Sequence, residues 1–220
     1  MKKVLFILLA LVVAAPGIAK KKTFQLPPQN LINVGLDVYL EFVRLGDTKL
    51  GIAPGEKLNQ ARIDKKHPIA FYYVREDSLL VSNKLDRIFI DMKRVMYPVF
   101  LDGRIRGSVT FAMRENGWQA VEFADSIEVV RILRIKEKLR LGKGKQDVTV
   151  VAYMPTTKHT IYLEGNNLAS AKVTSPNILD VADAMDFYDD ELQFLNTPRV
   201  PIGDFIKGYR DYINDIEDGP

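Results

Sequence analysis

The residues from Val95 to Ala124, VMYPVFLDGRIRGSVTFAMRENGWQAVEFA, constrain the fold more than any other part of the chain. Runs rich in β-branched and aromatic residues flank Asp102-Gly103. Such a pair is typical of a two-residue hairpin, because a type I′ turn needs positive φ at both central residues. A second turn signal, Asn116-Gly117, follows the next run. The stretch therefore predicts a meander of three antiparallel strands.

The first hairpin predicts its own register. A two-residue loop pairs Leu101 with Arg104, and an unbroken ladder then pairs Met96 with Val109. Since side chains alternate between the two faces of a sheet, one face of the meander is apolar and is expected to form the core. This predicted core face consists of Met96, Phe100, Ile105, Val109, Phe111 and Met113.

The second hairpin needs a different loop. A two-residue loop at Asn116-Gly117 would place Glu122 opposite Phe111 and would turn the third strand inside out. A three-residue loop over 115–117 instead places Val121 opposite Phe111. We therefore expect a type I turn followed by a glycine bulge, with Gly117 in the left-handed region.

The opposite face of the meander is a candidate interaction face. Arginine, tyrosine and tryptophan are enriched among the residues that anchor protein interfaces, and an arginine over a tryptophan ring gains cation–π attraction. The alternative is an ordinary solvated sheet face on which arginine stems cover apolar surface. The predicted interaction face consists of Tyr97, Arg104, Arg106, Arg114 and Trp118, with Arg114 directly across from Trp118.

The first 19 residues resemble a secretory signal peptide. Lys2 and Lys3 form a basic start, residues 4–13 an apolar run, and residues 17–19 a small-residue cleavage site ending at Ala19. The apolar run is too short for a membrane span, which needs about 20 apolar residues. We expect export with cleavage near Ala19 and no transmembrane segment in the mature chain. An uncleaved anchor is the alternative.

Cysteine content and charge narrow the class of protein. The chain has no cysteine, so it forms no disulfide, and among exported proteins this favours a bacterial periplasmic or extracellular one. Without Lys2 and Lys3 the net charge falls from +3 to +1, which argues against a nucleic-acid partner. Residues 20–150 carry a net charge of +8 and residues 151–220 a net charge of −7. The acidic C-terminal part is therefore expected to dock on the basic body.

Periodicity and turn residues predict the remaining elements. The helix over 127–141 ends at Gly142 and presents a wide apolar stripe that suits a sheet face. Its basic residues Arg131, Arg134 and Lys138 are candidates for contact with an anion, although a solvated basic face is the simpler explanation. The other predicted elements are a disordered tail over 20–29, helices over 30–45 (capped by Asn30 or Asn33), 178–195 and 202–216, and strands over 69–75, 79–81, 87–91, 147–154, 160–163 and 169–174.

No motif for catalysis or for a cofactor is present in the sequence. Thiol chemistry is excluded, and neither a Gly-x-Ser-x-Gly elbow nor a His-Glu-x-x-His helix occurs. The two histidines, His67 and His159, lie far apart in sequence and outside any ligand-spaced motif. The carboxylates over 180–191 lie in a predicted helix rather than in a loop that could wrap a calcium ion. We predict no cofactor and no metal.

Two segments carry a resemblance: "LGI…PGEKL…ARIDKKHPIAFYYV", and "YPVFLDGRIRGSVTFAMRENGWQAVEFADS". They are similar to a loose group of exported bacterial proteins of unassigned function that share a Pro-Val strand, an Asp-Gly or Asn-Gly turn and a Gly-Trp strand. The resemblance covers roughly residues 46–142. It implies an exported α+β domain and brings no catalytic residues with it.

The predicted fold class is α+β: an antiparallel meander sheet over about 95–124, covered by helix 127–141, with a second strand group and C-terminal helices. Residues 30–146 would form the core domain and 147–220 a docked C-terminal part. The predicted function is that of a binding or accessory protein of the bacterial envelope, whose partner is an unidentified protein or envelope component. The alternatives are a hydrolase with a carboxylate or histidine site assembled from distant residues, and a module resembling a protease inhibitor.

Overall fold

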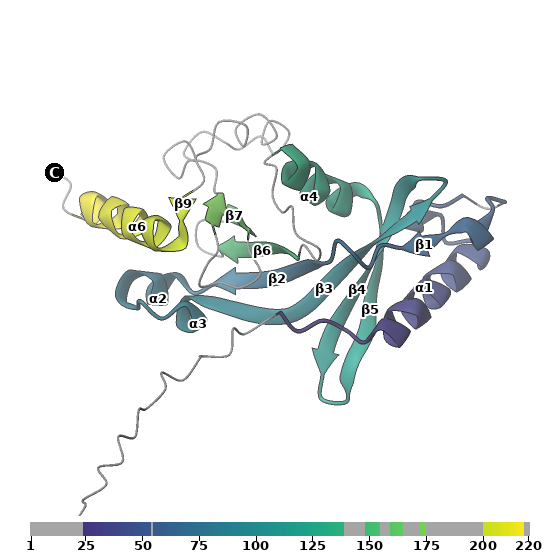
Figure 1. The fold of residues 1–220 in the computed structure, drawn as a ribbon, viewed down its shortest axis with the longest axis horizontal. Helices are drawn as coiled ribbons and strands as arrows, with labels where there is room; N and C mark the ends of the chain where they lie inside the picture. The colour runs from purple at the N-terminus through teal and green to yellow at the C-terminus, as the bar shows by residue number, and fades with distance from the viewer. Residues whose placement is uncertain are drawn as a thin grey trace, which may run out of the picture.

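The computed structural model describes residues 24–53, 55–138, 148–154, 159–164, 172–174 and 200–217. These residues form one mixed sheet with helices packed on it (Figure 1). The strand order is β5-β4-β3-β2-β6-β7-β8-β9, and β1 also pairs with β3. Every pairing is antiparallel except that of β2 with β6. The predicted α+β fold with an antiparallel meander is confirmed.

The bounds of the elements follow the predicted order closely. The strands are β1 Arg62–Ile63, β2 Ile69–Val74, β3 Phe89–Leu101, β4 Arg104–Arg114, β5 Gly117–Asp125, β6 Thr149–Met154, β7 His159–Glu164, β8 Lys172–Thr174 and β9 Val200–Pro201. The helices are α1 Gln29–Arg44, α2 Glu76–Val81, α3 Leu85–Ile88, α4 Ile127–Lys138 and α6 Ile202–Glu217, with 3₁₀ turns η1 Thr48–Leu50 and η2 Leu58–Gln60.

The first hairpin has the predicted turn but not the predicted ladder. Asp102 and Gly103 both have positive φ, 51° and 73°, and Leu101 pairs with Arg104. The register then shifts by one residue and leaves Arg106 as a bulge in β4. The predicted pairing of Met96 with Val109 is therefore wrong: Tyr97 lies opposite Val109.

The bulge changes which residues of β3 share a face with β4. The α1 face of the sheet carries Val95, Tyr97, Val99 and Leu101 of β3, and these join Val109 and Phe111 of β4 in the main core. Met96 and Ile105, which the sequence predicts on that same face, lie on the opposite face under α4. They are still shielded, because both faces of the sheet are covered at this point.

The second hairpin also differs from its prediction. Arg114 pairs with Gly117, so residues 115–116 form the loop and the predicted three-residue loop is wrong. Gly117 does have the expected positive φ, 101°. Phe111 lies opposite Ala120 rather than Val121, because the extra residue is Val121 itself, in the middle of β5.

Helix α1 covers the main core face of β4 and β5, and the expected helix over 30–45 is confirmed. Its cap position is Pro28 with no side-chain hydrogen bond, so the predicted asparagine caps are wrong. A Cβ on Gly35 would lie 2.4 Å from the ring of Phe111, so α1 can approach β4 this closely only with glycine there. The preceding residues 24–28 were predicted as part of a disordered tail, yet Phe24 packs edge-on against Tyr72 with ring centroids 6.1 Å apart.

Helix α4 covers the other face, where Val129 and Ile132 pack with Met96 and Val151. It starts at the predicted residue, Ile127. At the far end of the sheet α6 docks through Phe205, Ile206 and Tyr209, beside α2 and α3 (Figure 1). The short strand predicted over 79–81 is wrong, since these residues belong to the helix α2. The strand predicted over 87–91 is right from Phe89, where β3 begins, but residues 87–88 are the end of α3.

Two predictions lie outside the described residues: the signal peptide of residues 1–19 and the acidic helix over 178–195. The strands predicted near 147–154 and 160–163 are present as β6 and β7 and pair antiparallel. Strand β6 also pairs with β2, so the chain after residue 146 continues the same sheet. Helix α6 matches the helix expected over 202–216.

Candidate functional site

A shallow open depression lies on the α4 face of the sheet, where β3, β4 and β5 extend past the first turn of α4. In Figure 1 the β4–β5 turn projects away from both α1 and α4. The depression consists of two adjoining hollows that share Met113 and Arg114. We call it the outer depression and define it by Met92, Lys93, Arg94, Arg114, Val121 and Glu122.

Two β-bulges frame the outer depression. Phe71 pairs with Arg94 and Tyr72 with Asp91, so Met92 and Lys93 form an insertion in β3. Lys93 has a positive φ of 50°, and its backbone N–H donates to Asp91 Oδ1 at 2.7 Å. Bulges redirect side chains and are common beside functional sites. A non-glycine residue held at positive φ adds strain that the surrounding structure must support.

The bulges expose apolar side chains beside the basic residues Lys93 and Arg114. Met92 of the first bulge is 43% exposed, and Val121 of the second is 37% exposed. Methionine fills irregular partner surfaces well, because its side chain is unbranched and polarisable. The outer depression therefore offers apolar contact area on both sides of Arg114.

One ion pair spans the outer depression. Arg94 Nη2 of β3 donates to Glu122 Oε2 of β5 at 2.5 Å, across the intervening β4. On β4, Arg94 lies opposite Ala112 and Glu122 lies opposite Thr110, so the ion pair crosses β4 diagonally. Arg94 Nε is buried without a hydrogen-bond partner in the part of the chain that the structure describes. The neighbouring Glu128 has a raised pKa, because it is desolvated and lies near the Glu122 carboxylate.

The five residues of the predicted interaction face do not form one patch. Tyr97 is 1% exposed and belongs to the main core, because the Arg106 bulge reverses the face of β4 relative to β3. Trp118 pairs with Met113 rather than with Arg114, and packs against the core on the α1 face. Arg104 is exposed beside the first hairpin turn. Of the five residues, only Arg114 belongs to the outer depression.

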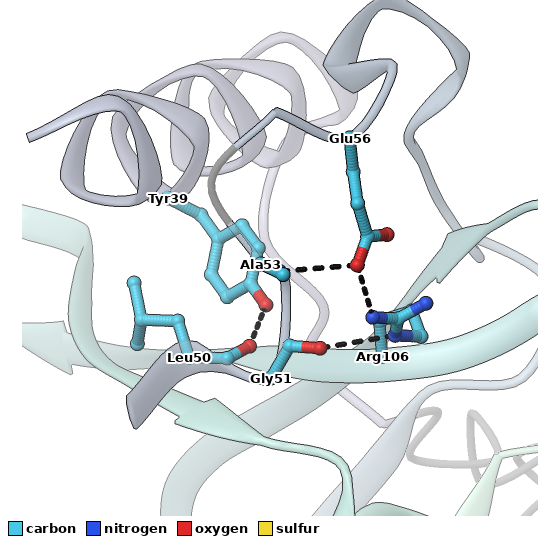
Figure 2. Close-up of polar contacts among 6 residues, drawn as sticks. All are labelled: Tyr39, Leu50, Gly51, Ala53, Glu56 and Arg106. Carbon is cyan, nitrogen blue, oxygen red and sulfur yellow. Dashed lines mark hydrogen bonds and ion pairs between the residues drawn. The ribbon is translucent and has the colours of Figure 1, made fainter. Parts of the chain in front are cut away.

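The remaining residue, Arg106, holds the segment after α1 on the sheet (Figure 2). Its Nη2 donates to Glu56 Oε1 at 2.6 Å, and its Nε donates to the carbonyl of Gly51 at 3.0 Å. Glu56 Oε1 also accepts from the backbone N–H of Ala53 at 3.1 Å. We call these contacts the Arg106 clamp. The pKa of Glu56 is lowered, first by the Ala53 N–H and then by Arg106.

Close backbone contacts show that the Arg106 clamp is part of the fold. Gly51 has a φ of 77°, and a Cβ there would lie 2.1 Å from the carbonyl oxygen of Arg106. A Cβ on Gly107 would lie 2.2 Å from the hydroxyl of Tyr39, which donates to the carbonyl of Leu50. Burial raises the pKa of Tyr39 above its usual range, so the hydroxyl stays protonated and remains a donor. Arg106 is therefore engaged in the fold rather than free for a partner.

The anion contacts predicted on α4 stay a prediction. Arg131 and Arg134 are exposed on the helix, and Lys138 is its last residue. The side chain of Lys138 lies outside the described part. Neither of the two arginines lines the outer depression.

The histidines were the other residues that sequence reasoning singled out. His67 Nδ1 lies 2.6 Å from Asp64 Oδ2 on the turn between β1 and β2, with the imidazole 46% exposed. The outer depression contains neither residue. His159 begins β7, and its side chain is not among those described.

The described part of the chain contains no group of three potential metal ligands. None of its helices is long and apolar enough to cross a membrane.

Sequence reasoning missed most of the outer depression. Met92, Lys93 and Arg94 fall between the strand predicted over 87–91 and the meander predicted from Val95, and no turn residue marks the bulge. The one local signal is Asp91, whose side chain can bond the backbone two residues on. Comparison with protein-family models, with curated proteins and with solved structures finds no match for this chain.

Proposed function

We propose that this chain is an exported, non-catalytic binding or accessory protein of the bacterial envelope, and that it contacts its partner through the outer depression. The observation that carries the proposal is the pair of cations, Lys93 and Arg114, set between exposed apolar side chains on a bulge-framed surface. Arginine and methionine are enriched in protein interfaces relative to the rest of the surface.

The side chains of the depression suit recognition of a carboxylate. Arg94 is already engaged by Glu122, whereas neither Lys93 nor Arg114 has an ion-pair partner among the described residues. An arginine can bind a carboxylate with two parallel hydrogen bonds. Met92 and Val121 add apolar contacts beside it. The partner surface that fits carries acidic side chains next to apolar ones.

The lining also favours binding over catalysis. It contains no histidine, serine, threonine or tyrosine that could serve as nucleophile or proton carrier beside the cations. Of its two carboxylates, Glu122 is held in an ion pair across β4, and Glu115 lies in the exposed β4–β5 turn. The depression is open, whereas an enzyme site usually shields its reacting groups from bulk solvent.

Export is supported by the sequence of the first 19 residues. For an exported chain, the absence of cysteine favours a bacterial protein. The test is subcellular fractionation of the full chain with a C-terminal tag, followed by mass spectrometry of the purified protein. We expect a periplasmic or extracellular product whose N-terminus follows Ala19 or a close neighbour. A cytoplasmic product that retains Met1 to Ala19 would contradict export.

The binding site is tested by capturing envelope proteins on the purified protein, with cross-linking before washing. Arg114→Glu should reduce recovery of the specific partner by about tenfold or more, because it reverses the charge that faces a carboxylate. Arg104→Glu is the matched control, since it is exposed on the same strand but roughly 33 Å away. Equal recovery with both variants would place the contact elsewhere. Circular dichroism confirms that both variants stay folded.

A further inference from the structure

Strand β5 is the terminal strand of the sheet among the described residues. Its outer edge is covered only near Asp125, where Gly51 of the segment after α1 approaches it. Residues 117–123 therefore present unpaired backbone groups along one edge. Such an edge pairs readily with another strand unless charge, proline, a bulge or a covering element prevents it. The bulge at Val121 divides this edge, so the uninterrupted part is residues 117–120.

Helix α1 presents a second, exposed apolar face next to this edge. Val34, Val38, Phe42 and Leu45 are 53%, 37%, 42% and 75% exposed. Their spacing of four, four and three residues places them in one stripe along the helix. We call these four residues the α1 stripe.

The α1 stripe lies on the β5 side of the helix. The ring of Phe42 packs against Phe123 of β5 with centroids 5.4 Å apart. Of the charged residues of α1, Glu41 borders the stripe, about 20° around the helix from Val34, and it is paired with Arg44 at 3.0 Å. Asp37 and Arg44 lie farther round on the same side, about 60–80° from Val34. Figure 1 shows α1 beside β5, with no labelled element beyond it.

We propose that a second copy of this chain occupies this surface. The β5 strands of the two copies pair antiparallel about a two-fold axis and extend the sheet across the dimer. The two α1 helices then lie side by side on one face of the joined sheet and bury their stripes against each other. The α1 stripe lies on the opposite face of the sheet from the outer depression, although Val121 and Glu122 of the depression belong to the same strand β5. The oligomeric state can be measured without reference to the proposed function.

The position of α1 favours a second copy over a foreign strand. The helix lies over both outer strands: Gly35 meets Phe111 of β4, and Tyr39 lies 6.4 Å from Phe123 of β5 between ring centroids. Neighbouring strands are about 4.8 Å apart, which places α1 about 5 Å from the two-fold axis. The two helices would therefore be about 10 Å apart, which is the usual packing distance of helices.

The surface area that a stable dimer must bury, and the charges near the two-fold axis, are compatible with this arrangement. A stable interface buries roughly 1,200–2,000 Å² in total. A short strand pair alone gives less than this, so the dimer also requires burial of the two stripes. The four residues of the α1 stripe carry no charge. The nearby carboxylates Glu41 and Glu122 are each paired with an arginine, Arg44 and Arg94, so neither would be buried as an unpaired charge.

The first test measures the oligomeric state of the purified protein by sedimentation equilibrium. We expect a dimer whose dissociation constant rises by at least about tenfold in Val38→Lys, because a charge would be buried in the middle of the joined stripes. Val81→Lys is the matched control, because Val81 is 86% exposed on α2, away from this surface. The dissociation constant of this variant should equal that of the wild type. A wild-type protein that stays monomeric at about 100 µM would overturn the proposal.

A second test works even where Val38→Lys weakens the fold. The chain has no cysteine, so a single introduced cysteine reports on its own symmetry mate. In an antiparallel helix pair the middle of the stripe lies near the axis, so Val38→Cys should form an intermolecular disulfide on mild oxidation. Val81→Cys should not. Equal cross-linking of the two variants, or none with Val38→Cys, would contradict the dimer and would favour a foreign strand at β5.

Discussion

Two arginines tie peripheral segments to the body of this protein, and they do so with different partners. Arg106 of β4 binds the segment after α1 through a carboxylate, Glu56, and one carbonyl, that of Gly51. Arg210 of α6 binds the end of α2 without any carboxylate: it donates to the carbonyls of Leu79 and Ser82 at 2.8 and 2.6 Å, and to the side chain of Asn83 at 3.0 Å.

The difference follows from what each segment offers. Helix α2 has six residues, and the last carbonyls of any helix lack donors within it. Arg210 supplies these donors and interacts favourably with the negative end of the helix dipole. The segment after α1 has no helix end to offer at this point, so Glu56 provides the charge. One contact therefore depends on ionisation, and the other depends on backbone geometry.

The largest expected effect tests how far the Arg106 clamp also depends on backbone geometry. Gly51→Ala would place a Cβ 2.1 Å from the carbonyl oxygen of Arg106, at a φ of 77°. Backbone must move to relieve this contact, and the glycine conformation is lost as well. We expect the free energy of unfolding to fall by about 3 kcal/mol, measured by urea denaturation.

Gly55→Ala is the control for this substitution. Gly55 also has a positive φ, 92°, but a Cβ there would meet nothing within 4 Å. The cost should be only the conformational one, about 1 kcal/mol. If both variants lose the same free energy, the close approach of Gly51 to Arg106 does not matter and the clamp rests on the ion pair alone.

The next prediction compares the contributions of Arg106 and Arg210 to stability. Arg210→Ala leaves two part-buried carbonyls without a donor, whereas Arg106→Ala leaves one, and Glu56 keeps its bond from the Ala53 N–H. We expect losses of about 2 and about 1 kcal/mol of the free energy of unfolding. Lys207→Ala, exposed on α6, should cost little. If Arg106→Ala lost more free energy of unfolding than Arg210→Ala, the ion pair with Glu56 would contribute more than the hydrogen bonds to the carbonyls.

Much of the fold is predictable from local signals, because the elements are set by turn residues and periodicity. Asp102-Gly103 has the expected positive φ angles, and α4 begins at the predicted Ile127. The first predicted register fails beyond the bulge at Arg106, and the second fails between its turn and the bulge at Val121. A bulge is fixed by contacts distant in sequence, such as that of Arg106 with Glu56, and carries no turn residue of its own.

The candidate site was predictable only at Arg114. The faces assigned to Tyr97 and Trp118 depended on an unbroken ladder, and one bulge in each hairpin was enough to move both onto the α1 face. A slip of one residue exchanges the two faces of a strand. Lys93 and Met92 were missed because their insertion in β3 is visible only against the register of β2.

The smallest expected effect is a difference in acid sensitivity between the two contacts. The pKa of Glu56 is lowered in the folded protein, chiefly by the Ala53 N–H and also by Arg106. A depressed carboxyl pKa contributes stability above the unfolded value, about 4.3 for glutamate, and loses it as the pH falls through the folded value. Arg210 has no carboxylate partner among the described residues, so its contact should not change in that range.

Hydrogen exchange at acidic pH, corrected for intrinsic rates, checks this difference. Amides of residues 49–57 should lose protection below about pH 4 relative to pH 6, while those of α6 keep theirs. Glu56→Gln should already show the reduced protection at pH 6 and lose the pH dependence, because its amide keeps an acceptor but not the charge. If residues 49–57 and α6 lose protection together, acid acts on the whole fold and the two arginine contacts do not differ in their dependence on ionisation.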